Sequence, residues 1–315
     1  MSEETLFDVA IIGGGPGGLA AAIYTCRSRL QTLLIDSMGG GGQLNIIDHI
    51  ENYPGVVPQS GLDLATHMRA QAEGFGATVT FDEIAKVSPE GELFRIQGAS
   101  GSFLARTLIV ASGARHKELC IPSEERLKGR GVSYCATCDG NFFKDQRVVV
   151  VGGGDTAVKD AIYLSRLVRK LTLVHRRDKL RAEKLLADKL IEKTRGGNVT
   201  IEWNHVLDEV LGDDSGVTGM RLRHTSGSTK ELAVHGVFIA IGHTPNTQLF
   251  AGQLEMDNGY LRTLCGSEGN ATATSIPGIF AAGDVQDMHY RQAITSAGTG
   301  CMAAKDAERY LDMLK

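Results

Sequence analysis

The chain has 315 residues, of which 42% are hydrophobic and 22% are charged, and it contains 39 glycines. This length favours two domains over one, and the composition excludes collagen-like and disordered proteins. The formal net charge of -4 argues against a general attraction to nucleic acid, and no apolar run reaches the roughly 18 residues of a membrane span.

The number of cysteines and the first residues of the chain indicate the cellular compartment of the protein. Six cysteines in so long a chain are too few for a disulfide scaffold, and four of them stand alone: Cys26, Cys120, Cys265 and Cys301. For these four we expect structural roles. The start Met1–Glu4 lacks the basic region of a signal peptide, so we expect a cytoplasmic protein.

The first clear element is an apolar strand over residues 7–12, which enters a glycine turn and then an alanine-rich helix. In this turn, which also holds Pro16, Gly13 permits the tight bend, Gly15 lets backbone approach a pyrophosphate, and Gly18 lets strand and helix pack. Free N–H groups at the helix start would bind phosphate. The pattern indicates a dinucleotide site, the alternative being a glycine turn without a ligand.

The same unit occurs a second time. An apolar strand over residues 147–151 enters a second turn, and a helical pattern follows through about Arg169. Here Gly152, Gly154 and Ala157 take the three roles, with Asp155 and Thr156 between them. Each copy ends in a buried-type strand that runs into a glycine, Gly113 in one and Gly242 in the other. Two copies in matching context predict two Rossmann-like dinucleotide-binding domains.

A last strand-like run over residues 278–282 leads into Gly283 and Asp284, and an alanine-rich helix closes the chain. The simplest α/β topology places residues 1–115 and 246–315 in one discontinuous domain. Residues 116–245 then form a second domain that is inserted into the first.

The residues that close the second strand of each copy indicate which dinucleotide binds where. The first copy has Asp36 there, and the second has His175 in the equivalent place, followed by Arg176, Arg177 and Arg181. An Asp accepts hydrogen bonds from ribose hydroxyls, whereas guanidinium groups match a 2'-phosphate. We therefore expect NADPH in the inserted domain and FAD, as its hydride acceptor, in the first. A turn role for Asp36 and a solvated basic face for the arginines are the alternatives.

Cys135 and Cys138 form the only cysteine pair in the sequence. On a helical turn, residues three apart share a face, which suits a redox disulfide, and a helix N-terminus favours the thiolate. Zinc would need a second ligand pair at matching spacing, and none follows, so we expect no metal. Inert buried thiols remain an alternative. Asp139 is either a helix-cap carboxylate or an acid and base for the thiols.

These motifs resemble, nearly end to end, the low-molecular-weight thioredoxin reductases of bacteria. Further matching segments are Gly42-Gln43-Leu44, Glu51-Asn52-Tyr53-Pro54-Gly55, Cys135-Ala136-Thr137-Cys138-Asp139-Gly140, and the tail from Gly283-Asp284 through Arg291-Gln292-Ala293. The larger disulfide reductases carry their redox cysteines on the first helix, where this chain has only Cys26. Ser112 stands where the family often has Thr, and Asp155 stands where it often has Asn. Neither difference removes a chemical group that the reaction of the family needs.

The resemblance implies a homodimer with one FAD per chain, NADPH as donor and thioredoxin as the protein disulfide substrate. It implies that Cys138 faces the flavin, that Cys135 attacks the disulfide of thioredoxin and that Asp139 is the acid. It also implies that the inserted domain rotates between half-reactions, about the crossings near Gly113 and Gly242. The residues that it adds to the FAD site are Gly42, Gln43, Leu44, Asn52, Gly113, Gly283, Asp284, Arg291, Gln292 and Ala293.

Two other functions stay open from the sequence. A related flavoenzyme could use oxygen, a small dithiol or disulfide, or another redox protein as acceptor. The other hypothesis is a non-enzymatic module that senses a nucleotide or holds zinc.

Overall fold

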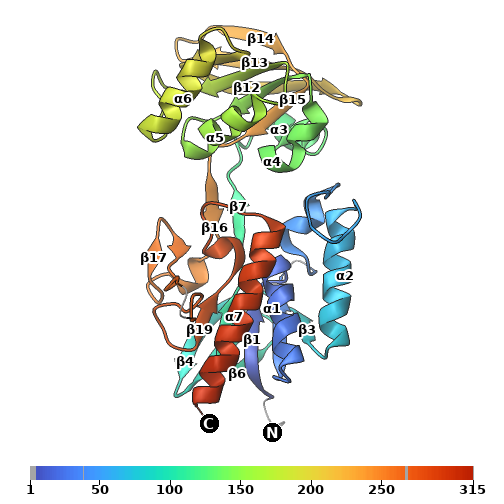
Figure 1. Cartoon of the computed structure of the whole chain (residues 1–315), viewed down its shortest axis with the longest axis vertical. Helices are drawn as coiled ribbons and strands as arrows, with labels where there is room; N and C mark the ends of the chain where they lie inside the picture. Colours follow the sequence, from blue (N-terminus) through green and yellow to red (C-terminus); the bar gives the residue numbers. More distant parts are fainter. Residues whose placement is uncertain (1–4, 38, 267–268, 315) are drawn as a thin grey trace. The chain divides into compact units, whose positions relative to one another are not determined.

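A computed structural model describes residues 5–37, 39–266 and 269–314, so the start Met1–Glu4 used above lies outside the described residues. The chain forms two compact units (Figure 1), which we call unit 1 (residues 1–115 and 244–315) and unit 2 (residues 116–243). It passes between them in strands β7 (Ala114–His116) and β16 (His243–Pro245), which pair with each other. None of the helices in the described ranges is long and apolar enough to span a membrane.

Unit 1 is built on a seven-stranded sheet in the order β3-β2-β1-β6-β5-β4, with β19 paired to β6. Strands β1, β2, β3, β6 and β19 pair in parallel, and β4 and β5 add an antiparallel ribbon. Its elements are β1 (Leu6–Ile12), α1 (Pro16–Arg27), β2 (Thr32–Asp36), η1 (Gly42–Ile46), α2 (Gly61–Gly74), β3 (Thr78–Phe81), β4 (Ile84–Glu90), β5 (Leu93–Gly98), β6 (Ser102–Val110), η3 (Gln248–Phe250), β17 (Met256–Asp257), β18 (Tyr260–Leu261), β19 (Ile279–Ala281), η4 (Gly283–Val285) and α7 (Ala293–Met313).

Helices α1 and α7 lie side by side in unit 1 (Figure 1), and small residues explain how closely they approach. A Cβ atom on Gly300 of α7 would collide with the backbone carbonyl of Gly17 in α1. Alternate residues of β1 enter two different hydrophobic cores, with Val9 and Ile11 in one and Ala10 and Ile12 in the other. The parallel strands are therefore apolar on both faces, as buried parallel sheets require.

Unit 2 contains a five-stranded parallel sheet in the order β11-β10-β9-β15-β8 and a three-stranded antiparallel sheet in the order β12-β13-β14. Its elements are α3 (Pro122–Leu127), β8 (Val132–Ser133), α4 (Ala136–Asp139), η2 (Gly140–Phe143), β9 (Arg147–Val151), α5 (Asp155–Leu164), β10 (Lys170–His175), α6 (Lys184–Thr194), β11 (Val199–Trp203), β12 (His205–Asp213), β13 (Gly216–His224), β14 (Thr229–Ala233) and β15 (Gly236–Ile239).

Different elements pack on the two faces of the parallel sheet in unit 2. Val148 and Val150 of β9 pack with residues of α5 and α6, whereas Val149 and Val151 pack with residues of β12 and β13. One face is thus covered by helices and the other by the antiparallel sheet. The predicted α/β class with parallel sheets is confirmed.

One expected boundary was wrong. The helical pattern was expected to continue through about Arg169, but α5 ends at Leu164. The backbone N–H groups of Arg169 and Lys170 both donate to the carbonyl of Gln146, at 2.8 and 3.2 Å, which turns the chain into β10. The helix itself ends in a tighter local turn, because Arg166 and Leu167 donate to the carbonyls three residues before them and the Ser165 hydroxyl donates to the Ile162 carbonyl.

Candidate redox and dinucleotide sites

A disulfide joins Cys135 and Cys138 across the first turn of α4, with their Cα atoms 5.3 Å apart. Cys135 is the N-cap residue, and its Sγ accepts a hydrogen bond from the backbone N–H of Cys138 at 3.2 Å. The same N–H would stabilise a thiolate on Cys135 after reduction. The expected helical turn with its two sulfurs together is confirmed, and the other four cysteines are free thiols.

Asp139, the predicted acid, is held by a residue that the sequence motifs do not mark. The buried Ser133 donates its hydroxyl hydrogen to Oδ2 of Asp139 at 2.6 Å. The same Oγ accepts a hydrogen bond from the backbone N–H of Cys135 at 3.1 Å. Ser133 thus ties the first cysteine and the carboxylate into one polar cluster. The available signal was a hydroxyl residue two positions before the cysteine pair, which favours a local side-chain to backbone bond.

Tyr134 anchors the chain directly before Cys135. Its hydroxyl donates to Oε1 of the buried Glu124 at 2.9 Å, and its ring stacks on His116 with the ring centroids 3.6 Å apart. Burial, followed by the hydrogen bond to Glu124, raises the pKa of Tyr134 far above its ordinary value. Burial and the nearby charge of Lys128 lower the pKa of His116. The phenol and the imidazole are therefore neutral near pH 7, and they fix the entry into the disulfide turn.

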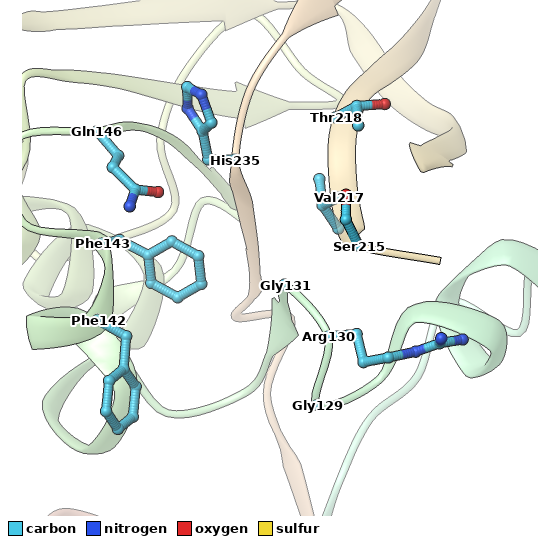
Figure 2. Close-up of a pocket in the computed structure, with 10 residues that line it drawn as sticks. All are labelled: Gly129, Arg130, Gly131, Phe142, Phe143, Gln146, Ser215, Val217, Thr218 and His235. Carbon is cyan, nitrogen blue, oxygen red and sulfur yellow. The ribbon is translucent and has the colours of Figure 1, made fainter. Parts of the chain in front are cut away.

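A cleft of about 500 Å³ lies next to η2, the short helix that follows the disulfide turn (Figure 2). Phe142 and Phe143 occupy one side of it and Arg130 the other, while the remaining lining residues are Gly129, Gly131, Gln146, Ser215, Val217, Thr218 and His235. The side chain of Phe142 is 50% exposed. Unit 2 thus presents an exposed aromatic ring shortly after its disulfide and a cation shortly before it.

The second glycine turn lies at the carboxyl end of β9, where it is joined to the loop after β10. The carbonyl of Gly153 accepts a hydrogen bond from the backbone N–H of Arg181 at 2.7 Å. Oδ1 of Asp155 accepts one from the backbone N–H of Glu183 at 2.8 Å. These bonds place the predicted turn of Gly152, Gly154, Asp155, Thr156 and Ala157 beside the segment that carries the arginines.

Arg176, Arg177 and Arg181 are exposed, and no described carboxylate lies within 4.0 Å of their guanidinium nitrogens. His175 differs from them, because its ring is buried against Gly153 and its Nε2 lies 3.0 Å from the carbonyl of Lys179. Burial lowers the pKa of His175. Three unpaired cations therefore remain for an anion, with a neutral imidazole beneath them.

In unit 1 a cleft of about 600 Å³ lies along the first glycine turn. Nine of the predicted FAD contacts line it: Gly13, Gly15, Pro16, Asp36, Gly42, Gln43, Gly113, Gly283 and Asp284. Oδ2 of the buried Asp36 accepts a hydrogen bond from the backbone N–H of Gly40 at 2.8 Å. The backbone of Gly41 donates to the carbonyl of Gly14 at 2.6 Å, which brings the segment before Gly42 to the turn.

The other predicted residues of unit 1 lie elsewhere. Gly18 and Leu44 are buried, and a Cβ atom on Gly18 would collide with the carbonyl oxygen of Gly13. Nδ2 of Asn52 donates to Oε1 of Gln292 at 3.4 Å. Gln292 is the N-cap of α7, which begins at Ala293, and Arg291 has a left-handed φ of 50°. None of these other predicted residues lines the cleft, and Asn52 and Gln292 form a separate polar contact.

The cleft residues that the sequence analysis missed include Ser296, Asn246 and Asp82. Ser296 donates its hydroxyl hydrogen to Oδ1 of Asp284 at 2.9 Å, and Asn246 exchanges hydrogen bonds with Ser112 at 2.7 and 2.8 Å. Asp82 also lines the cleft. Burial raises the pKa of Asp284 to about 6. No local motif marks these partners, because each comes from a distant part of the chain.

Comparisons with known proteins agree with this geometry. Residues 7–300 match the pyridine nucleotide-disulphide oxidoreductase family. A thioredoxin reductase of Vibrio cholerae serotype O1 is 53% identical, with 99% of each chain covered. A protein of Pseudomonas fluorescens named glucosaminate ammonia-lyase is 52% identical, with 98% of this chain and 96% of the other covered. The crystal structure of thioredoxin reductase from Streptococcus pyogenes MGAS5005 superposes with a TM-score of 0.90 at 38% identity, covering 99% of this chain and all of the other. The chain belongs to the pyridine nucleotide-disulphide oxidoreductase family and, within it, to the bacterial-type thioredoxin reductases.

Proposed function

We propose that this chain is an NADPH-dependent thioredoxin-disulfide reductase that holds FAD in unit 1 and NADPH in unit 2. The observation that carries the proposal is the disulfide between Cys135 and Cys138, with the carboxylate of Asp139 beside it. Bound FAD would take a hydride from NADPH and supply two electrons to this disulfide. The residues of the chain bind and orient the two dinucleotides and carry out the thiol chemistry.

The cleft of unit 1 suits FAD. Its glycine turn opens the N-terminus of α1, whose free N–H groups would bind a pyrophosphate, and the carboxylate of Asp36 would accept hydrogen bonds from a ribose. Asp284 lies in the same cleft, and burial raises its pKa. A neutral ligand with hydroxyl groups, such as the ribityl chain, would donate hydrogen bonds that stabilise its carboxylate.

Unit 2 suits NADPH for a different reason. Arg176, Arg177 and Arg181 offer guanidinium groups that no described carboxylate neutralises, at the end of the strand where the ribose is held in this fold. A 2'-phosphate would pair with them, whereas NADH lacks that group. The arginines therefore favour NADPH over NADH.

The thiol chemistry balances with these groups. Two electrons cleave the Cys135–Cys138 bond and leave two sulfurs, which take up protons from solvent, with Asp139 as the group that would bind a proton and pass it on. The thiolate of Cys135 then attacks the disulfide of thioredoxin and forms a mixed disulfide, which the sulfur of Cys138 resolves. Reduced thioredoxin leaves, and the disulfide of the chain is restored. Because the disulfide lies in unit 2 and the FAD cleft in unit 1, we include a rotation of unit 2 about β7 and β16 between the half-reactions.

The test compares single cysteine variants. We expect purified protein to be yellow and to reduce thioredoxin with NADPH, and we expect Cys138→Ser and Cys135→Ser to lose this turnover. Bleaching of the flavin by anaerobic NADPH should survive in both, because it does not require the disulfide. Cys120→Ser is the matched control, since Cys120 is an exposed free thiol of unit 2. Normal turnover in Cys138→Ser would refute the dithiol route.

The cleft in Figure 2 supports a protein as the disulfide substrate, because exposed aromatic rings and arginines are typical anchors of protein interfaces. We expect Phe142→Ala to raise the KM for thioredoxin about tenfold and to leave the KM for NADPH unchanged. Leu185→Ala is the control, because Leu185 is 66% exposed on α6 of the same unit. An unchanged KM for thioredoxin would remove this cleft from the partner surface.

We also propose a homodimer that works in the cytoplasm, where thioredoxin systems keep thiols reduced. Sedimentation equilibrium of the flavin-loaded protein should give twice the chain mass of 33.7 kDa. A single-chain mass at all concentrations would contradict the dimer.

The name of the Pseudomonas fluorescens relative motivates a second candidate, the release of ammonia from glucosaminate. This reaction needs no disulfide, so the Cys138→Ser variant would retain it. Ammonia release by both wild-type protein and that variant would support this candidate. Rapid NADPH oxidation in air without any disulfide substrate would instead point to oxygen as the acceptor.

A further inference from the structure

Two cations lie side by side at the amino edge of the parallel sheet in unit 2. Arg147 is the first residue of β9 and Lys170 the first of β10, and the strand register pairs them directly. Both are exposed, whereas the residues that follow them in each strand are buried. Like charges paired across neighbouring strands are destabilising, so this register has an electrostatic cost. The preceding residue, Arg169, adds a third positive charge.

These charges have no ion-pair partner in the described part of the chain. Among the described residues, no carboxylate oxygen lies within 4.0 Å of the charged nitrogens of Arg147, Arg169 or Lys170. Asp145, the nearest acidic residue in the sequence, uses its backbone N–H to bind the carbonyl of Leu167 and makes no such ion pair. The pairing of two like charges across neighbouring strands is therefore not offset by an ion pair with a described residue. Uncompensated violations of such sequence rules are typical of functional positions.

The three cations line a cleft of about 550 Å³. Its other lining residues are Gly197, Asn198 and Thr200, so every lining residue is polar or glycine. The charged residues of this lining are all cations. A compact group with several negatively charged oxygens would gain a charge-assisted hydrogen bond from each cation.

The backbone that carries the cations is fixed. The carbonyl of Gln146 accepts hydrogen bonds from the N–H groups of Arg169 and Lys170, and the Asn198 carbonyl accepts one from Leu171 at 2.9 Å. Nδ2 of Asn198 donates to the carbonyls of Ser165 and Val168 at 3.0 and 2.7 Å. Three segments of the chain are thus locked together around the cleft before any ligand arrives, which reduces the entropy cost of binding.

We propose that this cleft is a binding site for a phosphate-type oxyanion, with Arg147, Arg169 and Lys170 as its ligands. The two guanidinium groups match the oxygens of a phosphate in pairs, and the ammonium adds a point charge. The site is separate from the three arginines after β10, because Lys170 begins that strand and His175 ends it. It goes beyond the proposed disulfide reduction, in which none of its residues takes part.

The test is calorimetric titration of the flavin-loaded protein with inorganic phosphate and with inorganic pyrophosphate, at an ionic strength matched with chloride. We expect wild-type protein to bind pyrophosphate, and we expect Lys170→Glu and Arg147→Gln each to weaken binding about tenfold or more, because each loses a charge-assisted hydrogen bond. Binding of phosphate alone would indicate a site for a single phosphate group. Tighter binding of pyrophosphate than of phosphate would indicate that the ligand of the cleft carries a diphosphate group.

Two controls separate this site from others. A variant with Arg176→Ala, Arg177→Ala and Arg181→Ala should keep pyrophosphate binding at the cleft, and Lys189→Glu reverses an exposed charge on α6 as a matched change. Lys170→Glu should also raise the melting temperature in chloride, because it replaces a like-charged register pair by an opposite one. If the Lys170→Glu variant fails to fold, the Arg169→Gln variant is used in its place, because Arg169 lies outside the strands. Pyrophosphate affinity that is absent in wild-type protein, or unchanged in the cleft variants, would overturn the proposal.

Discussion

The two glycine turns of this protein have the same plan and opposite electrostatics. In unit 1 the turn lines a cleft with two carboxylates, the buried Asp36 and the half-buried Asp284, whereas in unit 2 it lies beside the neutral ring of His175 and a segment with exposed arginines. The turns themselves specify only that a pyrophosphate can approach backbone. We propose that the residues that close the following strand decide which dinucleotide each unit prefers.

The largest expected effect removes the positive charge of unit 2. We expect Arg176→Ala combined with Arg177→Ala to raise the KM for NADPH by roughly two orders of magnitude or more, because each lost charged hydrogen bond costs about 1.5–3 kcal/mol. The KM for NADH should change little, since NADH has no 2'-phosphate. Steady-state assays with both nucleotides measure this. An unchanged ratio of the two KM values would show that these arginines do not select NADPH over NADH.

The next effect tests the third small residue of each turn. A Cβ atom at Gly18 would collide with the backbone oxygen of Gly13, whereas the second turn already accommodates the methyl group of Ala157. We expect Gly18→Ala to destabilise unit 1 by about 3 kcal/mol, the upper range for overpacking, and to lower the flavin content. The reciprocal change Ala157→Gly should cost about 1 kcal/mol or less. Urea unfolding and the visible spectrum measure both, and equal losses would contradict this account.

A pH experiment tests the carboxylate of Asp284 in the cleft of unit 1. The pKa of Asp284 in the folded protein is about 6, above its ordinary 3.8, so the folded protein keeps a proton that the unfolded chain releases. The stability of flavin-free protein should therefore fall as pH rises through this window. We expect Asp284→Asn to be more stable by about 2 kcal/mol near pH 7 and to have no advantage near pH 3. Urea unfolding at both pH values measures this, and an equal gain at both would exclude titration of Asp284 as the cause.

The smallest effect concerns the disulfide turn, which has no counterpart in unit 1. We expect Ser133→Ala to lower kcat for thioredoxin a few-fold, because one hydrogen bond to the carboxylate of Asp139 is worth about 1–2 kcal/mol. Ser133→Thr should restore it, and the exposed Ser226→Ala should have no effect. Flavin bleaching by NADPH should be equal in all of them. A loss in Ser133→Thr as large as in Ser133→Ala would indicate a packing defect.

The sequence allowed prediction of whatever depends on neighbouring residues. Both glycine turns, their strands and the helical turn of Cys135 and Cys138 follow from local backbone geometry, and the structure contains them. The contacts of Ser133 with Asp139 and of Ser112 with Asn246 depend on how the chain returns to itself. The turn from residue 169 into β10 has the same origin, since the carbonyl of Gln146 binds the backbone there.

The paired strands β7 and β16 have a consequence for engineering. Hydrogen bonds from Lys117 to Gly242 and from Asn246 to Gly113, both 2.9 Å, hold the outgoing and returning chain together. The coding segment for residues 116–243 could therefore be excised and expressed as a stand-alone protein with neighbouring ends. A short turn joining Arg115 to Thr244 would close the remaining scaffold, which could then accept a foreign insert at the same place.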